Sequence, residues 1–251
     1  MTAFPSRAAV VALSLIAGPA AAEGPSLGAI GCPAEAVTIA VLGDSLADGL
    51  WGSFFRAFAA CPTVDVLRLT TVSDGLAKSD ASDWLGRLGP EGQGADLIVV
   101  QMGANDITNI REGTTRAVFG SPEWEAAYGA RAAELAEGLV AVTPDVVWMG
   151  LPIVGQERFE ESYRAITAIQ AAAAEAAGVA FVDTHEPTSF GLGEFVMSAE
   201  IDGTLRQIRN TDQVHFTEVG YDMVAGLIRG DVEQLFRKAG SAAAIDALVL
   251  Q

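Results

Sequence analysis

The chain has 251 residues, half of them hydrophobic, and a formal net charge of −17. This length suits one sizeable α/β domain and is too short for two comfortable ones. The excess of acidic residues argues against nucleic acids and anionic membrane surfaces as partners. Acidic composition also serves solubility, so the charge identifies no substrate.

The N-terminus has the pattern of a secretory signal peptide. Arg7 precedes an apolar run, and Ala20–Ala22 offers an A-x-A cleavage site before Glu23. The run is shorter than the roughly 18 apolar residues of a membrane span. We therefore expect a signal peptide over residues 1–22, no stable membrane insertion after cleavage, and one exported domain over residues 23–251. Loss of Arg7 leaves 14 basic and 32 acidic residues, a net charge of −18.

The chain contains only two cysteines, Cys32 and Cys61. In an exported protein an even pair predicts a disulfide, here between the segment before the first strand and the end of the first helix. A nucleophilic cysteine is the alternative, but no local pattern supports it. The two histidines and the lack of a cysteine cluster make a metal site improbable and predict no cofactor.

The first predicted strand, Val37–Leu42, is a continuous apolar run typical of a buried parallel strand. Gly43-Asp44-Ser45 follows it, and then a helix begins. An apolar stripe is predicted for this helix at Trp51, Phe54, Phe55 and Phe58. Unpaired N–H groups at such a helix start favour an oxyanion beside the Ser45 hydroxyl, although Ser45 as a mere helix cap is the alternative. The sequence lacks both the G-x-S-x-G elbow and the P-loop ending.

The rest of the chain alternates predicted strands with predicted helices. Further strands are expected at 64–69, 96–102, 146–149 and 179–182. Helices are expected around Trp84 and Leu88, at 123–142, at 158–177, from Thr217 with Val219, Met223, Leu227 and Ile228 on one face, and after Gly240. Such alternation predicts a parallel sheet with right-handed crossovers.

Ligands bind such sheets at the carboxyl ends of the strands. The turns that contain Ser45, Asn105 and Leu151-Pro152 all fall at that edge, which favours a functional role for Ser45. Two long segments, 107–122 and 184–211, are expected to be irregular and to border the site. They are candidates for setting specificity.

A nucleophilic serine needs a base, which is usually histidine. Asp212 stands three residues before His215, a spacing that lets the carboxylate orient the imidazole toward a hydroxyl. Asp183 and His185 form a competing pair after the last strand, and we favour His215. Candidate donors to an oxyanion are the Ser45 N–H, the Gly75 N–H and the Asn105 amide. Alternatively, Gly75 merely relieves a turn and Asn105 caps one.

The ordered set Gly43-Asp44-Ser45-Leu46, Gly75, Gly103-Ala104-Asn105-Asp106 and Asp212-Gln213-Val214-His215 resembles the four sequence blocks of the SGNH/GDSL hydrolase superfamily. The resemblance spans residues 37–235. The continuation after Leu46 and the Gly150-Leu151-Pro152 turn are similar to an exported bacterial branch. The second block reads Ser-Asp-Gly-Leu, which departs from the family pattern and puts Gly75 in doubt.

The resemblance implies a three-layer α/β/α sandwich with a flavodoxin-like, five-stranded parallel sheet of order 2-1-3-4-5. It implies a metal-free triad of Ser45 as nucleophile, His215 as general base and acid, and Asp212 as its orienter. Ser45, Gly75 and Asn105 would form the oxyanion hole. We interpret Asp44 and Asp106 as structural.

The expected function is therefore a periplasmic or secreted serine esterase that removes a small acyl group, such as acetyl, from a glycan or other polar small-molecule ester. A glycan O-acyltransferase and a lipase or thioesterase use the same site chemistry and stay open. A non-catalytic envelope protein with this fold is a further alternative. The sequence does not indicate an oligomeric state.

Overall fold

The computed structural model describes residues 27–249, so the predicted signal peptide lies outside the described residues. Five parallel strands form the central sheet, in the order β2-β1-β3-β6-β7. These strands are β1 (Val37–Gly43), β2 (Val64–Thr70), β3 (Leu97–Gln101), β6 (Val146–Met149) and β7 (Ala180–Val182). The predicted strands agree with them to within about one residue at each end. The predicted sheet order 2-1-3-4-5 is confirmed.

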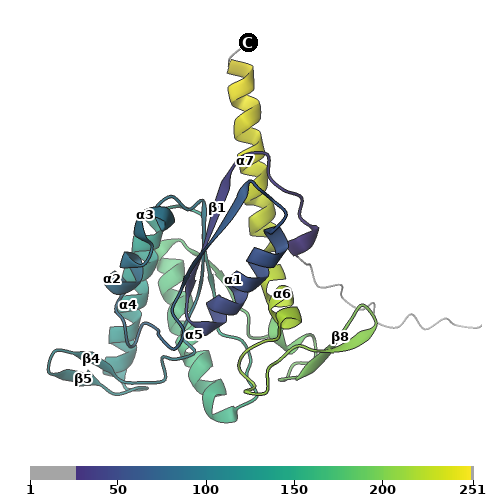
Figure 1. The fold of residues 1–251 in the computed structure, drawn as a ribbon. Helices are drawn as coiled ribbons and strands as arrows, with labels where there is room; N and C mark the ends of the chain where they lie inside the picture. Colours follow the sequence, from purple (N-terminus) through teal and green to yellow (C-terminus); the bar gives the residue numbers. More distant parts are fainter. Residues whose placement is uncertain (1–26, 250–251) are drawn as a thin grey trace, which may run out of the picture.

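Helices cover both faces of the sheet (Figure 1). Their bounds are α1 (Ser45–Phe58), α2 (Ala81–Gly86), α3 (Gly89–Gly92), α4 (Pro122–Val140), α5 (Glu157–Ala177), α6 (Glu218–Gly226) and α7 (Arg229–Val249), with short 3-10 turns η1 (Leu27–Ala29) and η2 (Pro187–Ser189). One core lies between the sheet and α2, α4 and α5, and the other lies between the sheet and α1, α6 and α7. The three-layer α/β/α sandwich is therefore confirmed.

The central strands β1, β3 and β6 are mostly apolar because both of their faces are buried, whereas the edge strand β2 carries Asp65 and Arg68 and is partly exposed. In β1, Ala40 and Leu42 point into one core, whereas Ile39 and Val41 point into the other. All four side chains are fully buried. Successive side chains of a strand face opposite ways, so a strand between two helical layers has few polar positions.

The predicted apolar stripe of α1 is only half correct. Phe54 and Phe58 are buried, but Phe55 is 53 % exposed and Trp51 is half-buried. The buried face starts instead from Leu46 and Leu50, which stand eight and four residues before Phe54. The prediction followed the aromatic residues of the helix. The buried face is instead decided by the side of α1 that packs against the sheet.

The predicted face of α6 and the predicted C-terminal helix also need correction. Val219 and Met223 are half-buried, while Tyr221 and Val224 pack into the core. Ile228 is buried as expected. The helix expected after Gly240 is not separate, because α7 continues through that position without a break.

The two long segments predicted to be irregular each contain a β-hairpin. The first is β4 (Ile110–Glu112) with β5 (Thr115–Ala117), and the second is β8 (Ser198–Ile201) with β9 (Thr204–Gln207). Both hairpins lie at the lower end of the molecule in Figure 1, where α1 begins. They therefore flank the carboxyl edge of the sheet.

The predicted disulfide between Cys32 and Cys61 is present, with a Cα–Cα distance of 5.4 Å. It joins the segment before β1 to the turn after α1. In the described part of the chain, no helix is long and apolar enough to cross a membrane.

Candidate active site

Ser45 is the first residue of α1, at the carboxyl end of β1. The cap of this helix is Asp44, whose Oδ1 accepts a hydrogen bond from the Leu46 N–H at 2.8 Å. The alternative that Ser45 is only a cap is therefore wrong. Gly43 is needed for the turn, because its φ is +142° and a Cβ there would lie 1.9 Å from the Gln101 carbonyl oxygen.

Ser45, His215 and Asp212 form a continuous chain of hydrogen bonds. Ser45 Oγ lies 2.7 Å from His215 Nε2, and His215 Nδ1 lies 2.8 Å from Asp212 Oδ2. Asp212 Oδ1 also accepts the backbone N–H groups of Val214 and His215, each at 2.9 Å. Asp212 and His215 share one tight turn, but Ser45 stands 167 positions before Asp212 in the sequence. The fold therefore brings together side chains from two distant segments.

The electrostatics of this turn fix the tautomer of His215. Partial burial opposes ionisation of Asp212, but the N–H donors of Val214 and His215 outweigh it, so the pKa of Asp212 lies below its usual value. An ionised carboxylate only accepts hydrogen bonds, so His215 Nδ1 carries the proton. Its Nε2 then presents a lone pair to the Ser45 hydroxyl.

The competing histidine, His185, lies elsewhere. Its Nε2 contacts Glu160 Oε1 near the start of α5, and its own N–H is bonded to Asp183 Oδ1 at 2.9 Å. Glu160 Oε2 in turn accepts the Val154 N–H at 3.1 Å. His185 is therefore part of the packing around the β6–α5 turn and does not contact Ser45.

The β6–α5 turn supports the loop that carries Asp212. Gln156 Nε2 donates to the Asp212 carbonyl oxygen at 2.8 Å, and the Gly155 N–H donates to the Gln213 carbonyl oxygen at 3.1 Å. Gly155 is tightly enclosed, because a Cβ there would lie 2.6 Å from the ring of Phe195. This turn follows Leu151-Pro152, which we predicted to lie at the carboxyl edge of the sheet.

Arg209 is a second support, and sequence analysis missed it. Its fully buried guanidinium donates to the carbonyl oxygens of Ile153 at 2.8 Å, Val214 at 3.0 Å and Thr188 at 3.3 Å. It also lies 3.6 Å from the centre of the Phe216 ring. Burial lowers the pKa of Arg209 to about 9, so the group is still a cation at neutral pH. The segment was predicted to be irregular, and no local signal marks this arginine as buried.

The three predicted oxyanion donors differ in their present partners. The Ser45 N–H lies in the first turn of α1, where backbone donors have no acceptor within the helix. Asn105 Nδ2 lies 3.1 Å from the Asp74 carbonyl oxygen and 3.4 Å from Asp44 Oδ2. The Gly75 N–H donates to Asp74 Oδ1 at 2.8 Å. The Gly75 N–H is therefore occupied by the carboxylate of its neighbour, and its role as an oxyanion donor stays a prediction.

Position 75 requires glycine because of close packing and not only because of a turn. A Cβ there would lie 2.1 Å from Asp106 Oδ1, so the backbone must approach this carboxylate closely. Asp106 accepts the N–H groups of Leu76 at 3.2 Å and Ala77 at 3.0 Å, and the Tyr128 hydroxyl at 2.7 Å. Asp106 thus ties the Gly75 loop to the loop after β3.

Asp44 makes the corresponding connection between the Ser45 turn and the Asn105 turn. Its Oδ2 accepts the N–H groups of Gly103 and Ala104, each at 3.0 Å. Burial raises the pKa of Asp44 to about 7 and that of Asp106 to about 6. Both carboxylates hold loops, which agrees with the structural role expected for them. Within the described residues, no three His, Cys, Asp or Glu side chains are grouped to hold a metal ion.

Comparison with known proteins gives a family and a fold. A family model described as "Protein of unknown function (DUF459)" matches residues 38–230. No curated protein is significantly similar to the sequence.

Three solved structures illustrate the likeness in fold. A lipase/acylhydrolase from Enterococcus faecalis is 18% identical, with a TM-score of 0.53 over 79% of this chain and 96% of its own. A catalytic mutant of the acetylxylan esterase Axe2 from Geobacillus stearothermophilus is 15% identical, with a TM-score of 0.54 over 80% and 95%. A GDSL-like lipase from Bacteroides thetaiotaomicron is 18% identical, with a TM-score of 0.50 over 85% and 94%. The chain therefore has the SGNH hydrolase fold.

Proposed function

Because this chain belongs to the DUF459 family and has the SGNH hydrolase fold, we propose that it is an exported serine esterase that removes small acyl groups, such as acetyl, from a glycan or another polar substrate. The observation that carries the proposal is the chain of hydrogen bonds from Ser45 through His215 to Asp212. This arrangement is the one that turns a serine hydroxyl into a nucleophile.

Acylation begins when Ser45 Oγ attacks the carbonyl carbon of the ester. His215 Nε2 takes the hydroxyl proton, and the carbonyl oxygen becomes an oxyanion. Asp212 stays ionised and stabilises the imidazolium through its bond to Nδ1–H. His215 then gives the proton to the alcohol oxygen as the ester C–O bond breaks, which leaves the acyl group on Ser45.

Deacylation repeats these steps with water as the nucleophile. His215 takes a proton from water, the resulting tetrahedral intermediate collapses, and the proton returns to Ser45 Oγ as the carboxylic acid leaves. The oxyanion of both steps is held by the Ser45 N–H, at the positive end of α1, and by the Asn105 amide. The Gly75 N–H joins them only when Asp74 Oδ1 releases it.

Three observations support a polar substrate outside the cytoplasm. The His215 and Asp212 side chains are 31% and 48% exposed, so the triad is open to bulky, hydrated esters. The disulfide is typical of an oxidising compartment, which agrees with the signal peptide predicted at residues 1–22. Axe2, which shares the fold, is an acetylxylan esterase.

The test uses residues 23–251 with p-nitrophenyl esters of increasing chain length. Ser45→Ala and His215→Ala are expected to lower kcat by about 10³-fold or more, because each removes a member of the triad. His185→Ala is the matched histidine control and is expected to keep wild-type turnover. Short esters are expected to react faster than long ones.

Full activity of Ser45→Ala would refute the triad mechanism. A preference for long acyl chains would assign the protein to the lipase or thioesterase class instead. If no ester is hydrolysed, labelling of Ser45 with a fluorophosphonate separates an active serine with an untested substrate from a non-catalytic protein.

A further inference from the structure

A hollow lies beside α1, and it starts one helical turn beyond Ser45, at Asp48. Ser45, Asp48, Gly49, Gly52 and Arg56 fall at i, i+3, i+4, i+7 and i+11, so they share one face of α1. Beside this face lies a cavity of about 360 Å³. Its lining comprises Asp48, Gly52, Arg56, Asn210, Thr217 and Glu218, which we call the α1–α6 groove.

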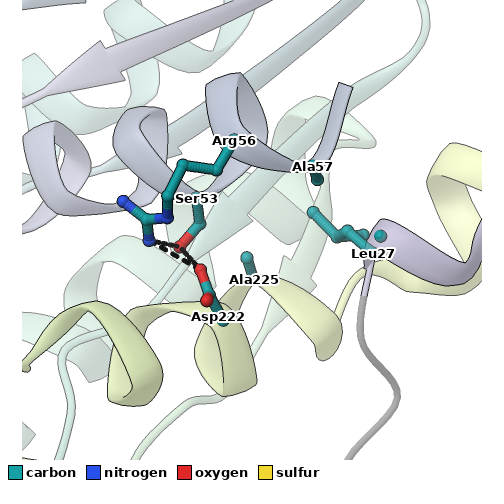
Figure 2. A pocket seen from close by; sticks show the side chains of 7 residues that line it. Leu27, Ser53, Arg56, Ala57, Asp222 and Ala225 are labelled. Atoms are coloured by element: carbon teal, nitrogen blue, oxygen red, sulfur yellow. Dashed lines mark hydrogen bonds and ion pairs between the residues drawn. The ribbon is translucent and has the colours of Figure 1, made fainter. Parts of the chain in front are cut away.

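A second hollow of about 210 Å³ lies on the far side of Arg56, where Leu27, Ser53, Asp222 and Ala225 help to line it (Figure 2). Arg56 borders both hollows and separates them. The rise of α1 from Ser45 to Arg56 is about 17 Å, a distance that a short oligosaccharide can span.

Two glycines of α1 border the groove, but only one of them leaves it open. At Gly49 the ring of Tyr221 approaches so closely that a Cβ would lie 2.0 Å from its Cζ, so this glycine lets α6 pack against α1. A Cβ at Gly52 would meet only the Nη1 of Arg56, at 3.3 Å, so packing does not explain this residue. A glycine inside a helix costs up to about 1 kcal/mol relative to alanine. Gly52 therefore lowers the stability of the helix slightly, at a position where a larger side chain would fill the groove.

The charged group in the middle of the groove is held in place. Arg56 Nη2 donates to Asp222 Oδ1 at 2.6 Å, to Ser53 Oγ at 3.1 Å and to the Glu218 carbonyl oxygen at 3.4 Å. Ser53 Oγ–H donates to the same Asp222 oxygen at 2.6 Å. Figure 2 shows these three side chains converging between α1 and α6. Such fixed groups bind a ligand with little further loss of side-chain entropy.

The groove begins next to the proposed triad, although no triad residue lines it. Asp48 is one turn of α1 beyond Ser45, and Phe216, which also borders the cavity, follows His215 directly. The Asn210 N–H is bonded to the His215 carbonyl oxygen at 2.8 Å. A substrate whose ester lies at Ser45 therefore has the groove as the path for its alcohol part.

The chemistry of the lining selects hydroxyl groups without net charge. The Glu218 carboxylate accepts hydrogen bonds, and the Asn210 amide and Arg56 donate them. The Asp48 carboxylate is paired with Arg68 and Arg56 is paired with Asp222, so Glu218 gives this lining a net negative charge, which disfavours anionic ligands. Trp51 forms a wall, but Phe55 stacks on its ring and Arg68 lies 4.8 Å from the ring centre. Recognition here rests on hydrogen bonds more than on aromatic stacking.

We propose that the α1–α6 groove is a subsite for the neutral oligosaccharide part of the ester, which extends from Ser45 toward Arg56. The inference deepens the proposed esterase function and rests on it for the position of the ester bond. It assigns a binding role to Gly52, Arg56, Asn210 and Glu218.

The first experiment measures binding without turnover. The Ser45→Ala variant is titrated with neutral tetrasaccharides of β-1,4-linked glucose, xylose and N-acetylglucosamine, and with tetragalacturonate as the anionic counterpart, while amide chemical shifts are followed by NMR. A neutral tetrasaccharide is expected to bind and to shift the signals of α1 and of residues 210–218. Adding Gly52→Leu is expected to weaken binding by about tenfold or more, as expected for the loss of one or two hydrogen bonds.

Two further variants make this test decisive. Gly230→Leu is the matched control, because Gly230 is also helical and exposed, lies on α7 and has no atom within 4 Å of an added Cβ. It is expected to leave binding unchanged. Asn210→Ala changes an exposed side chain and is expected to weaken binding without disturbing the fold, which guards against a Gly52→Leu variant that folds poorly.

The second experiment compares acetylated neutral tetrasaccharides with p-nitrophenyl acetate as substrates. Gly52→Leu is expected to raise KM for the acetylated tetrasaccharide relative to KM for p-nitrophenyl acetate. If the wild type hydrolyses p-nitrophenyl acetate but no neutral tetrasaccharide binds, or if Gly52→Leu binds it equally well, the groove proposal is overturned and the esterase stands. If binding depends on Gly52 but no ester is hydrolysed, the groove stands and the esterase function fails.

Discussion

At the scale of single residues, the site depends on two buried carboxylates that take no part in the proposed chemistry. Asp44 connects the Ser45 turn to the turn at Asn105, and Asp106 connects that turn to the loop of Gly75. Each accepts backbone N–H groups from a loop distant in sequence. The relative position of the nucleophile and the oxyanion donors therefore depends on these two carboxylates.

The raised pKa of Asp106 predicts a pH dependence of stability. Its pKa rises from 3.8 to about 6 on folding, so the native state binds more protons than the unfolded state between these values. The free energy of unfolding should therefore fall as pH rises from about 4 to 6, by roughly 3 kcal/mol for this group. Urea unfolding of the wild type and of Asp106→Asn across this range measures the difference.

In Asp106→Asn this component is absent, so the stability advantage of the wild type is expected to shrink as pH rises through the window. Glu161→Gln, an exposed change on α5, provides the baseline. A difference between wild type and Asp106→Asn that stays constant from pH 4 to 7 would contradict the assignment.

At the scale of elements, the loop between β9 and α6 is held by segments from two other parts of the chain. The β6–α5 turn binds the carbonyl oxygens of Asp212 and Gln213, and Arg209 joins this turn to the loop through Ile153 and Val214. These bonds add to the packing of Ile208, Val214 and Phe216, which are also buried. The position of His215 therefore depends on elements that contribute no catalytic group.

Arg209 is accordingly expected to be a positioning residue. Arg209→Met should lower kcat by about 10²-fold with little change in KM, because a small displacement of His215 removes the attack geometry. It should also destabilise the fold by about 1–3 kcal/mol, since buried carbonyl groups lose their donor. Steady-state kinetics below the melting temperature, with the NMR signal of the His215 Nδ1 proton, measure both effects.

Arg209→Lys keeps the charge but not the planar fork, so partial recovery of kcat is expected. If Arg209→Met unfolds more easily but keeps the wild-type kcat and Nδ1 signal, Arg209 supports the fold alone.

At the scale of the whole molecule, the sandwich gathers the proposed catalytic groups at one edge of the sheet. β1, β3 and β6 are parallel, so the turns after them emerge side by side. The disulfide lies at the other end of α1, where it links the chain before β1 to the turn after this helix. The helix that carries the proposed nucleophile is thus anchored at its far end.

Removal of the disulfide tests this anchor. The double variant Cys32→Ser/Cys61→Ser is expected to lose about 3–4 kcal/mol of stability, because the unfolded chain regains the entropy of an open loop. Urea unfolding of the variant and of the reduced wild type should give matching midpoints. A midpoint equal to that of the oxidised wild type would show that the bridge contributes nothing to stability.

Sequence patterns were sufficient to predict the parallel sheet and the candidate triad, whereas the strand order was implied by the resemblance to the SGNH/GDSL superfamily. Buried parallel strands have a local signal in the sequence, a run of apolar residues, and turns have another, glycine next to polar residues. Ser45 and the Asp212–His215 pair stand in such turns, so their edge of the sheet followed from the alternation of strands and helices. One available local signal was overlooked: Asp202-Gly203 has positive φ at both residues and forms the two-residue turn of the β8–β9 hairpin.

Only the tertiary structure decided which groups meet across distant segments. The burial of Arg209 among three loops depends on neighbours far away in sequence, and the exposure of Phe55 depends on the direction from which the sheet approaches α1. The same holds for the α1–α6 groove, since Gly52 is an ordinary helical glycine until α6 is placed beside it. The pattern of polar and apolar residues determines where helices and strands form. Long-range packing determines which groups each polar side chain contacts.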